Sequence, residues 1–168
     1  MPKLVKDGAI VDNEWTLMPK PENAPEAVEV PPGQVIVPLS VWLAQRETLQ
    51  ARSDIGVWLN SDEAPEELQD AADKLPLIAL HFPLFSDGRP FSSARLLRDR
   101  YGFTGELRAV GHVIRDQMCY LRRCGVNAFD FGDQDINLEE AVKSLDDFTE
   151  YYQASHDQPL PLFRRRVS

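Results

Sequence analysis

The sequence lacks any hydrophobic run long enough to span a bilayer, and its first residues, MPKLVKDGAIVD, lack the apolar core of a signal peptide. We therefore expect a cytoplasmic protein that does not insert into a membrane. Cysteine is scarce as well: Cys119 and Cys124 are the only two, and their spacing within an expected helix points their side chains in different directions. We expect reduced, structural thiols rather than a disulfide, a redox pair or a metal site.

The sequence motifs of common cofactors are also missing. No GxGxxG motif follows an expected strand, no GKS or GKT phosphate-binding loop occurs, and no nucleophile elbow is complete. The three histidines, His81, His112 and His156, form no metal-ligand pattern with the cysteines. The motifs therefore indicate no cofactor and no metal, and they leave open whether the protein is an enzyme.

Positive charge is in the minority, with 18 Lys and Arg against 27 Asp and Glu, which gives a net charge of -9 at pH 7. Such a charge repels a phosphate backbone, so we expect no binding to nucleic acid. The same charge suits docking to a basic protein partner, although solubility is its more common role. At 168 residues, of which 43% are hydrophobic, the chain suits one domain with a substantial core.

The chain divides into three parts by composition. Residues 1–33 predict a β-hairpin, in which Asp7 and Gly8 form a two-residue turn between LVK and AIV, and then a Pro-rich, acidic arm. Residues 34–155 predict the α/β core. Residues 156–168 contain two prolines in QPLPL and predict an extended tail.

Strand and helix patterns alternate about five times through the core. The expected strands are short apolar runs, at residues 35–39, 56–59, 77–82, 106–110 and 128–131. The expected helices begin at cap-like or helix-starting residues, namely Ser40, Pro65, Ser92 or Ser93, Gly111 with His112, and Asn137 with Glu140. Parallel neighbours need crossover helices, so this alternation predicts an α/β fold with a mainly parallel sheet. An open sheet of the doubly wound type is our first choice and a partial barrel is the alternative.

In either architecture, ligands bind beyond the carboxyl ends of the parallel strands. We therefore expect one rim formed by the residues that follow the strands, namely Ser40, 60–62, 81–93, Gly111 with His112, and 132–135. In particular, Asp87 to Ser93, His112 and Asp133 are expected to share this concave rim.

Four residues near the third strand predict a site for an anion. Ser92 and Ser93 stand at an expected helix start, where free N–H groups and the helix dipole attract negative charge, and Arg89 and Arg95 lie close by in sequence. A phosphate-, sulfate- or sulfite-like group fits this arrangement. The alternative is that the serines only cap the helix while the arginines pair with nearby acidic residues.

A second candidate pair could carry out acid–base chemistry. His112 starts an expected helix and Asp116 follows one turn later, so the carboxylate is placed to orient the imidazole as a general base. The alternative is that His112 is only a polar cap. His81 lies within an apolar strand, and we expect it to be a packed, hydrogen-bonded core histidine rather than a ligand.

The chain resembles the bacterial domain-of-unknown-function 934 family over FPLFSDGRPFSSARLLRDRYGFTGELRAVGHVIRDQMCYLRRCGVNAFDF, and more loosely from KLVKDG to the final helix. Members of this family often carry a name that describes them as oxidoreductases of sulfite reduction. The resemblance implies an association with assimilatory sulfite reduction, and it supplies no catalytic residues or cofactor. Together with the missing cofactor motifs and the acidic charge, it favours an accessory role, with docking on sulfite reductase or its electron donor. The alternative function is a small-molecule enzyme, such as an oxidoreductase, or an oxyanion-binding protein that uses the rim.

Overall fold

The structure of the chain is a computed structural model, and it describes residues 3–22, 24–83, 88–113, 115–132, 134 and 136–148. The extended tail expected at residues 156–168 lies outside these ranges. Asp87 and Asp133, two members of the expected rim, lie outside them as well.

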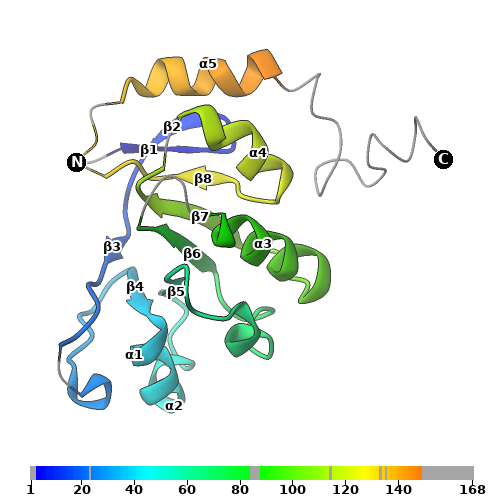
Figure 1. Cartoon of the computed structure of the whole chain (residues 1–168). Helices are drawn as coiled ribbons and strands as arrows, with labels where there is room; N and C mark the ends of the chain where they lie inside the picture. The colour runs from blue at the N-terminus through cyan, green and yellow to red at the C-terminus, as the bar shows by residue number, and fades with distance from the viewer. Residues whose placement is uncertain are drawn as a thin grey trace.

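Within the described residues, eight strands form one mixed sheet in the order β2-β1-β8-β7-β6-β5-β4-β3 (Figure 1). These strands are β1 (Lys3–Lys6), β2 (Ala9–Asp12), β3 (Thr16–Leu17), β4 (Val35–Pro38), β5 (Ile55–Leu59), β6 (Leu77–Phe82), β7 (Glu106–Gly111) and β8 (Ala128–Phe129). Strands β3 to β8 pair in parallel, whereas β1 pairs antiparallel with both β2 and β8. The α/β class and the mainly parallel sheet predicted from the sequence are therefore confirmed.

The predicted N-terminal hairpin is also confirmed, and its turn explains the register of β1 and β2. Asp7 has a φ of 51° and Gly8 a φ of 79°, so both central residues adopt the left-handed conformation that a tight hairpin turn requires. Lys6 consequently pairs with Ala9 across the turn.

The sheet is curved into a half-barrel, which is the partial-barrel alternative. Strands β3 to β8 follow one another in chain order, without the reversal of a doubly wound sheet. The two edge strands, β2 and β3, are joined only by Asn13, Glu14 and Trp15. The four residue steps from Asp12 to Thr16 span at most about 14 Å, whereas eight flat strands extend about 34 Å from edge to edge. The short link is therefore compatible only with a strongly curved sheet.

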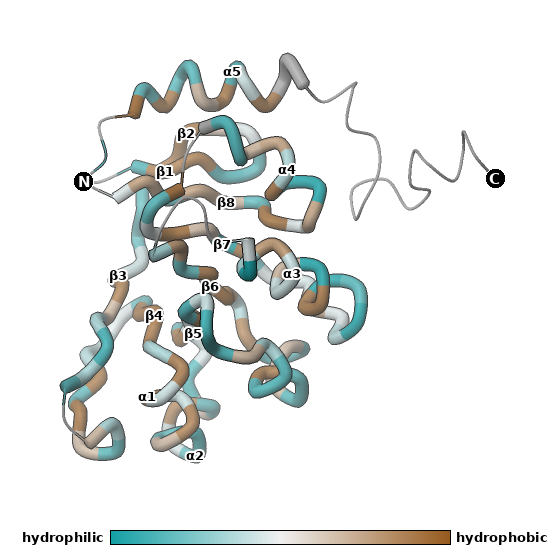
Figure 2. The backbone as a smooth tube through the Cα atoms, viewed as in Figure 1, coloured by the Kyte–Doolittle hydropathy of each residue, from teal (hydrophilic) through white to brown (hydrophobic). Residues whose placement is uncertain are grey.

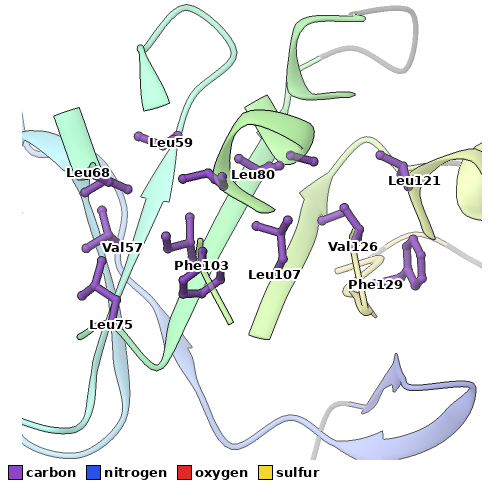
Figure 3. Close-up of a cluster of buried hydrophobic side chains, with 14 of the residues drawn as sticks. Val57, Leu59, Leu68, Leu75, Leu80, Phe103, Leu107, Leu121, Val126 and Phe129 are labelled. Atoms are coloured by element: carbon purple, nitrogen blue, oxygen red, sulfur yellow. The ribbon is translucent and has the colours of Figure 1, made fainter. Parts of the chain in front are cut away.

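The helices cover one face of the sheet, which is the convex face of the half-barrel (Figure 1). They are α1 (Leu39–Ala44), α2 (Arg46–Leu49), α3 (Arg89–Arg95), α4 (Met118–Arg123) and α5 (Leu138–Phe148), with 3-10 turns at Pro25–Ala27, Pro65–Leu68 and Arg115–Gln117 and a π-helical turn at Leu96–Arg100. Alternate residues of each strand, such as Ile78, Leu80 and Phe82 of β6, point into the core beneath these helices. Figure 3 shows this core between β5–β8 and the helical layer, and Figure 2 shows hydrophobic residues concentrated along the strands.

Three helices begin at other residues than the sequence predicted. α3 begins at Arg89 rather than at Ser92 or Ser93, because Pro90 has the fixed φ and the missing N–H that suit a first helical turn. α4 begins at Met118 rather than at Gly111, whose φ of 88° is incompatible with a helix. α1 begins at Leu39, so that Ser40 lies inside the helix and does not cap it.

Two other helix predictions agree more closely with the structure. The segment from Pro65 is a 3-10 turn followed by further turns rather than an α-helix, but its apolar residues are buried as expected, namely Leu68, Ala71, Ala72 and Leu75. α5 begins after Asn137, whose Oδ1 accepts a hydrogen bond from the backbone N–H of Glu140 at 3.2 Å. The predicted cap is therefore confirmed.

The concave face of the half-barrel carries a second, smaller apolar cluster. Ile36, Trp58, Leu77, Ala79 and Val110 point to this face and are buried. Trp15, in the link between the two edge strands, packs against them. The link therefore passes over the concave face and shields it from water. In the described part of the chain, none of the helices has the length and apolar character that crossing a membrane requires.

Candidate functional site

An open pocket of about 510 Å³ lies at the carboxyl ends of β6, β7 and β8. Its polar lining comes from His81 at the end of β6, His112 after β7, and Asp130 and Gln134 after β8. Its apolar lining includes side chains such as Leu17 of the edge strand β3. The pocket occupies the end of the half-barrel at which the parallel strands place the loops that follow them.

The imidazole of His81 is held in one tautomer by Asn60. The Nδ1 atom of His81 lies 3.2 Å from Oδ1 of Asn60, and the same oxygen accepts a hydrogen bond from the backbone N–H of Ser61 at 3.0 Å. A backbone N–H can only donate, so the atom between these two groups must be the amide oxygen. Nδ1 of His81 therefore carries the proton, and Nε2 has a free lone pair.

The surroundings of His81 favour its neutral form. Burial lowers the pKa of His81 below its ordinary value of 6.5, and the charge of His112 lowers it further. The ring of Trp58 packs against the imidazole, with 5.4 Å between ring centroids. His81 is thus packed and hydrogen-bonded, as the sequence predicts, and its half-buried ring also lines the pocket, in agreement with its place at the start of the expected rim segment 81–93.

Gly111 allows the end of β7 to lie directly against this imidazole. A Cβ atom at position 111 would come within 2.6 Å of the carbonyl oxygen of Phe82 and within 3.0 Å of Cδ2 and Nε2 of His81. The residue also has a φ of 88°. Glycine is therefore required here both by its backbone conformation and by the close contact with His81.

Asp130 and Gln134 shape the other side of the pocket. The carboxylate of Asp130 accepts hydrogen bonds from the backbone N–H of Gly132 at 2.9 Å and from Nδ2 of Asn13 at 3.2 Å. Nε2 of Gln134 donates to the carbonyl oxygen of Gly111 at 2.8 Å and to that of Val113 at 3.1 Å. The loops after β7 and β8 are thereby tied together beside an oriented carboxylate.

The pocket therefore combines a neutral imidazole, an oriented carboxylate and apolar walls. An imidazole that is unprotonated near neutral pH can accept a proton from a bound molecule. The described residues that line this pocket include no Lys or Arg. Nor do the described residues contain a group of three or more His, Cys, Asp or Glu side chains arranged to hold a metal ion.

The candidate pair His112 and Asp116 is not arranged as predicted. His112 is exposed and lines the pocket, whereas Asp116 is exposed in the 3-10 turn Arg115–Gln117 and is not among the lining residues. The positive φ of Gly111 ends the strand in a loop, so no helical turn connects the two side chains. A catalytic role for either residue stays a prediction.

The four residues predicted to bind an anion all lie on α3, but their side chains do not share one environment. Ser92 and Ser93 lie inside the helix, so the premise that they stand at its start is wrong. Nη2 of Arg89 donates to Oγ of Ser61 at 3.1 Å, which brings Arg89 to the same rim as His81.

Arg95 instead interacts with Cys124. Burial raises the pKa of the Cys124 thiol, and the hydrogen bond from Arg95 opposes this effect in part. Both Cys119 and Cys124 are free thiols, as predicted. Arg89 and Arg95 therefore contact different elements, and anion binding stays a prediction.

No signal in the sequence indicated that Asn13 and Asp130 belong to the site, whereas Gln134 lies within the range 132–135 that was expected on the rim. Asn60 was placed on the rim by its position after a strand, but no local signal linked it to His81. Asn13 is 117 residues from Asp130 in sequence. The two side chains meet because β2 and β8 both pair with β1, so that the residues following these two strands lie at the same end of the sheet.

One protein-family model matches residues 56–163, and its description is that of a bacterial protein of unknown function (DUF934). This range contains β5 except for its first residue and the whole of β6 to β8, and it therefore includes His81, His112 and Asp130. Comparison with curated proteins and with solved structures finds no match.

Proposed function

The chain belongs to the bacterial family of unknown function DUF934, and we propose that it is a small-molecule enzyme in which His81 accepts a proton from the substrate at its Nε2 atom. The observation that carries this proposal is the contact between Asn60 and Nδ1 of His81, which leaves Nε2 unprotonated. A general base needs this combination of a free lone pair and a fixed ring orientation.

The charges of the pocket favour a substrate with hydrogen-bond donors. Nε2 of His81 and the carboxylate of Asp130 both accept hydrogen bonds, and Asp130 also attracts a positively charged group. A free sulfite or sulfate ion would meet no Lys or Arg among the described lining residues. An oxyanion is better matched to Arg89, at the outer part of the rim, where the guanidinium lies beside Ser61.

We propose that this activity belongs to assimilatory sulfite reduction, on the basis of the family resemblance described above. Deletion of the gene is then expected to impair growth on sulfite while sparing growth on cysteine. Expression of the wild-type protein restores growth, and expression of His81→Gln does not. Glu47→Gln, an exposed change on α2, is the control that restores growth.

The outcomes separate the chemistry from the pathway. Full rescue by His81→Gln at wild-type protein levels refutes proton transfer by His81. Normal growth of the deletion strain on sulfite instead refutes the pathway assignment, whatever His81 does.

A second candidate function is docking on sulfite reductase or its electron donor as an accessory protein. The net charge of -9 supports it, because an acidic surface steers association with a basic partner. Capture of the partner by the purified protein should weaken as salt is raised above about 0.1 M, where charges are screened beyond about 10 Å. His81→Gln should dock and rescue growth normally under this candidate. If the protein restores growth without detectable docking on a partner, this second candidate function is refuted.

A further inference from the structure

A second pocket, of about 330 Å³, opens on the concave face of the half-barrel. Its lining comes from the β1–β2 hairpin, from the link between the edge strands, and from the first half of β7. Charged side chains of both signs line it, with the indole ring of Trp15 beside them. It shares no lining residue with the pocket that contains His81.

Arg108 is the central residue of this second pocket. It is only 2% exposed, and it is the one charged residue that is buried within the described part of the chain. Its Nε donates to Oε2 of Glu106 at 2.6 Å and its Nη1 donates to Oδ1 of Asn13 at 3.0 Å. Nη2 has no hydrogen-bond partner among the described residues. A buried guanidinium with an unused donor group offers a strong site for a carboxylate.

The acidic residues around Arg108 differ in whether they are already paired. Glu106 contacts both Arg108 and Lys6, whose Nζ lies 3.0 Å from Oε1 of Glu106. Asp12 is paired with Lys3 at 2.6 Å. Glu14, in contrast, is exposed and has no partner among the residues that the structure describes. The pocket therefore presents one unused set of positive donors and one unpaired carboxylate.

We propose that this pocket binds a small zwitterion, namely a free α-amino acid. The ligand carboxylate binds Nη2 of Arg108, the ligand ammonium group faces the carboxylate of Glu14, and the indole of Trp15 lies alongside the ligand. The volume of about 330 Å³ is at the small end of the usual range for ligand pockets, which fits a molecule of this size. This inference is independent of the function proposed for the pocket that contains His81.

The test compares a zwitterion with its two halves. L-alanine, propionate and ethylamine are titrated separately into the protein while the indole N–H signal of Trp15 is followed by NMR. L-alanine should shift this signal to saturation, and propionate and ethylamine should each bind at least tenfold more weakly, since each retains only one charged group. Equal affinities for L-alanine and propionate refute the ammonium contact. If L-alanine at roughly 100 mM causes no shift, its dissociation constant is weaker than any affinity of interest, and the site is refuted.

Two substitutions test the two contacts. Glu14→Gln removes the negative charge from an exposed residue and should weaken L-alanine about tenfold while leaving propionate unchanged. Glu47→Gln, which is distant on α2, is the matched control and should leave both affinities unchanged. Arg108→Lys keeps the charge but loses the guanidinium fork, and it should weaken both L-alanine and propionate.

Urea unfolding of each variant shows whether it is folded. If Arg108→Lys does not fold, Glu14→Gln still decides the proposal, because an unchanged affinity for L-alanine in that variant overturns it.

Discussion

Gly111→Ala tests whether the contact between the end of β7 and His81 determines the shape of the pocket. The added Cβ would approach the carbonyl oxygen of Phe82 to 2.6 Å, and that oxygen belongs to a central strand that cannot move away easily. It would also approach Nε2 and Cδ2 of His81 to 3.0 Å. The imidazole must therefore shift, and its hydrogen bond with Asn60 should be lost or distorted.

The stability cost of Gly111→Ala has two parts. A non-glycine residue in the left-handed region costs about 1–2 kcal/mol, and overpacking a tight site costs about 1–3 kcal/mol more. Gly132→Ala is the matched control, because Gly132 also lines the pocket and has a φ of 60°, but a Cβ there would meet nothing within 4 Å. Gly132→Ala should lose only the free energy of the unfavourable backbone conformation, so the free energies of unfolding of the two variants should differ by about 1–3 kcal/mol.

Urea unfolding measures this difference directly. With a slope of about 1–3 kcal/mol per molar urea for a protein of this size, the midpoint of Gly111→Ala should lie about 1 M below that of Gly132→Ala. NMR of the His81 side chain should show a changed tautomer or pKa in Gly111→Ala only. Equal urea midpoints together with an unchanged His81 signal would refute the steric argument.

Three further predictions concern titratable groups. Asn60→Asp places a carboxylate beside Nδ1 of His81 and should raise the pKa of that imidazole, which a histidine NMR titration measures; an unchanged pKa contradicts the assigned contact. Burial lowers the pKa of His81 below 6.5 in the folded protein, so the His81 imidazole binds a proton more readily in the unfolded chain. The free energy of unfolding should therefore be highest above pH 6.5 and should fall as the pH is lowered through the pKa of His81 in the folded protein. Urea midpoints should show this loss in the wild type and a smaller loss in His81→Gln; parallel curves contradict it. Burial raises the pKa of Cys124, so a thiol reagent should label the half-buried Cys119 first and label Cys124 only on unfolding; equal labelling rates contradict this order.

The strands and the hairpin were predictable because their signals are local. A continuous apolar run such as 77–82 indicates a strand buried on both faces, and β6 has that environment. Asp7 and Gly8 are the residue types that tolerate a left-handed turn, and both adopt it. Neighbours in sequence determine these features, so no knowledge of the tertiary structure was needed.

The helix starts were harder to predict because two local signals competed. Ser92 and Ser93 are good capping residues, but Pro90 lies earlier and begins the helix at Arg89. The apolar stripe after Gly111 predicts a helix, yet Gly111 has a positive φ that no helical residue adopts and packs closely against His81. A second local signal therefore decided where α3 begins, and α4 begins only after the loop at Gly111. The predicted pairs His112 with Asp116 and Ser92 with Ser93 lost their geometric basis as a result.

The half-barrel fold allows a short link to join the two edge strands, and the same link contributes a residue next to the candidate site. Its two edge strands must be joined across the concave face, and the first residue of the three-residue link is Asn13. Asn13 accepts a hydrogen bond from Arg108, 95 residues away, and donates one to Asp130, 117 residues away. One carboxamide thus connects a buried charge on β7 to the carboxylate of the pocket at the strand ends. The pairing of β7 with β8 places Arg108 on one strand and Asp130 directly after its neighbour, and the link between the edge strands brings Asn13 to both of them. The orientation of Asp130 therefore depends on the closure of the sheet, and a change at Asn13 should disturb both Arg108 and Asp130.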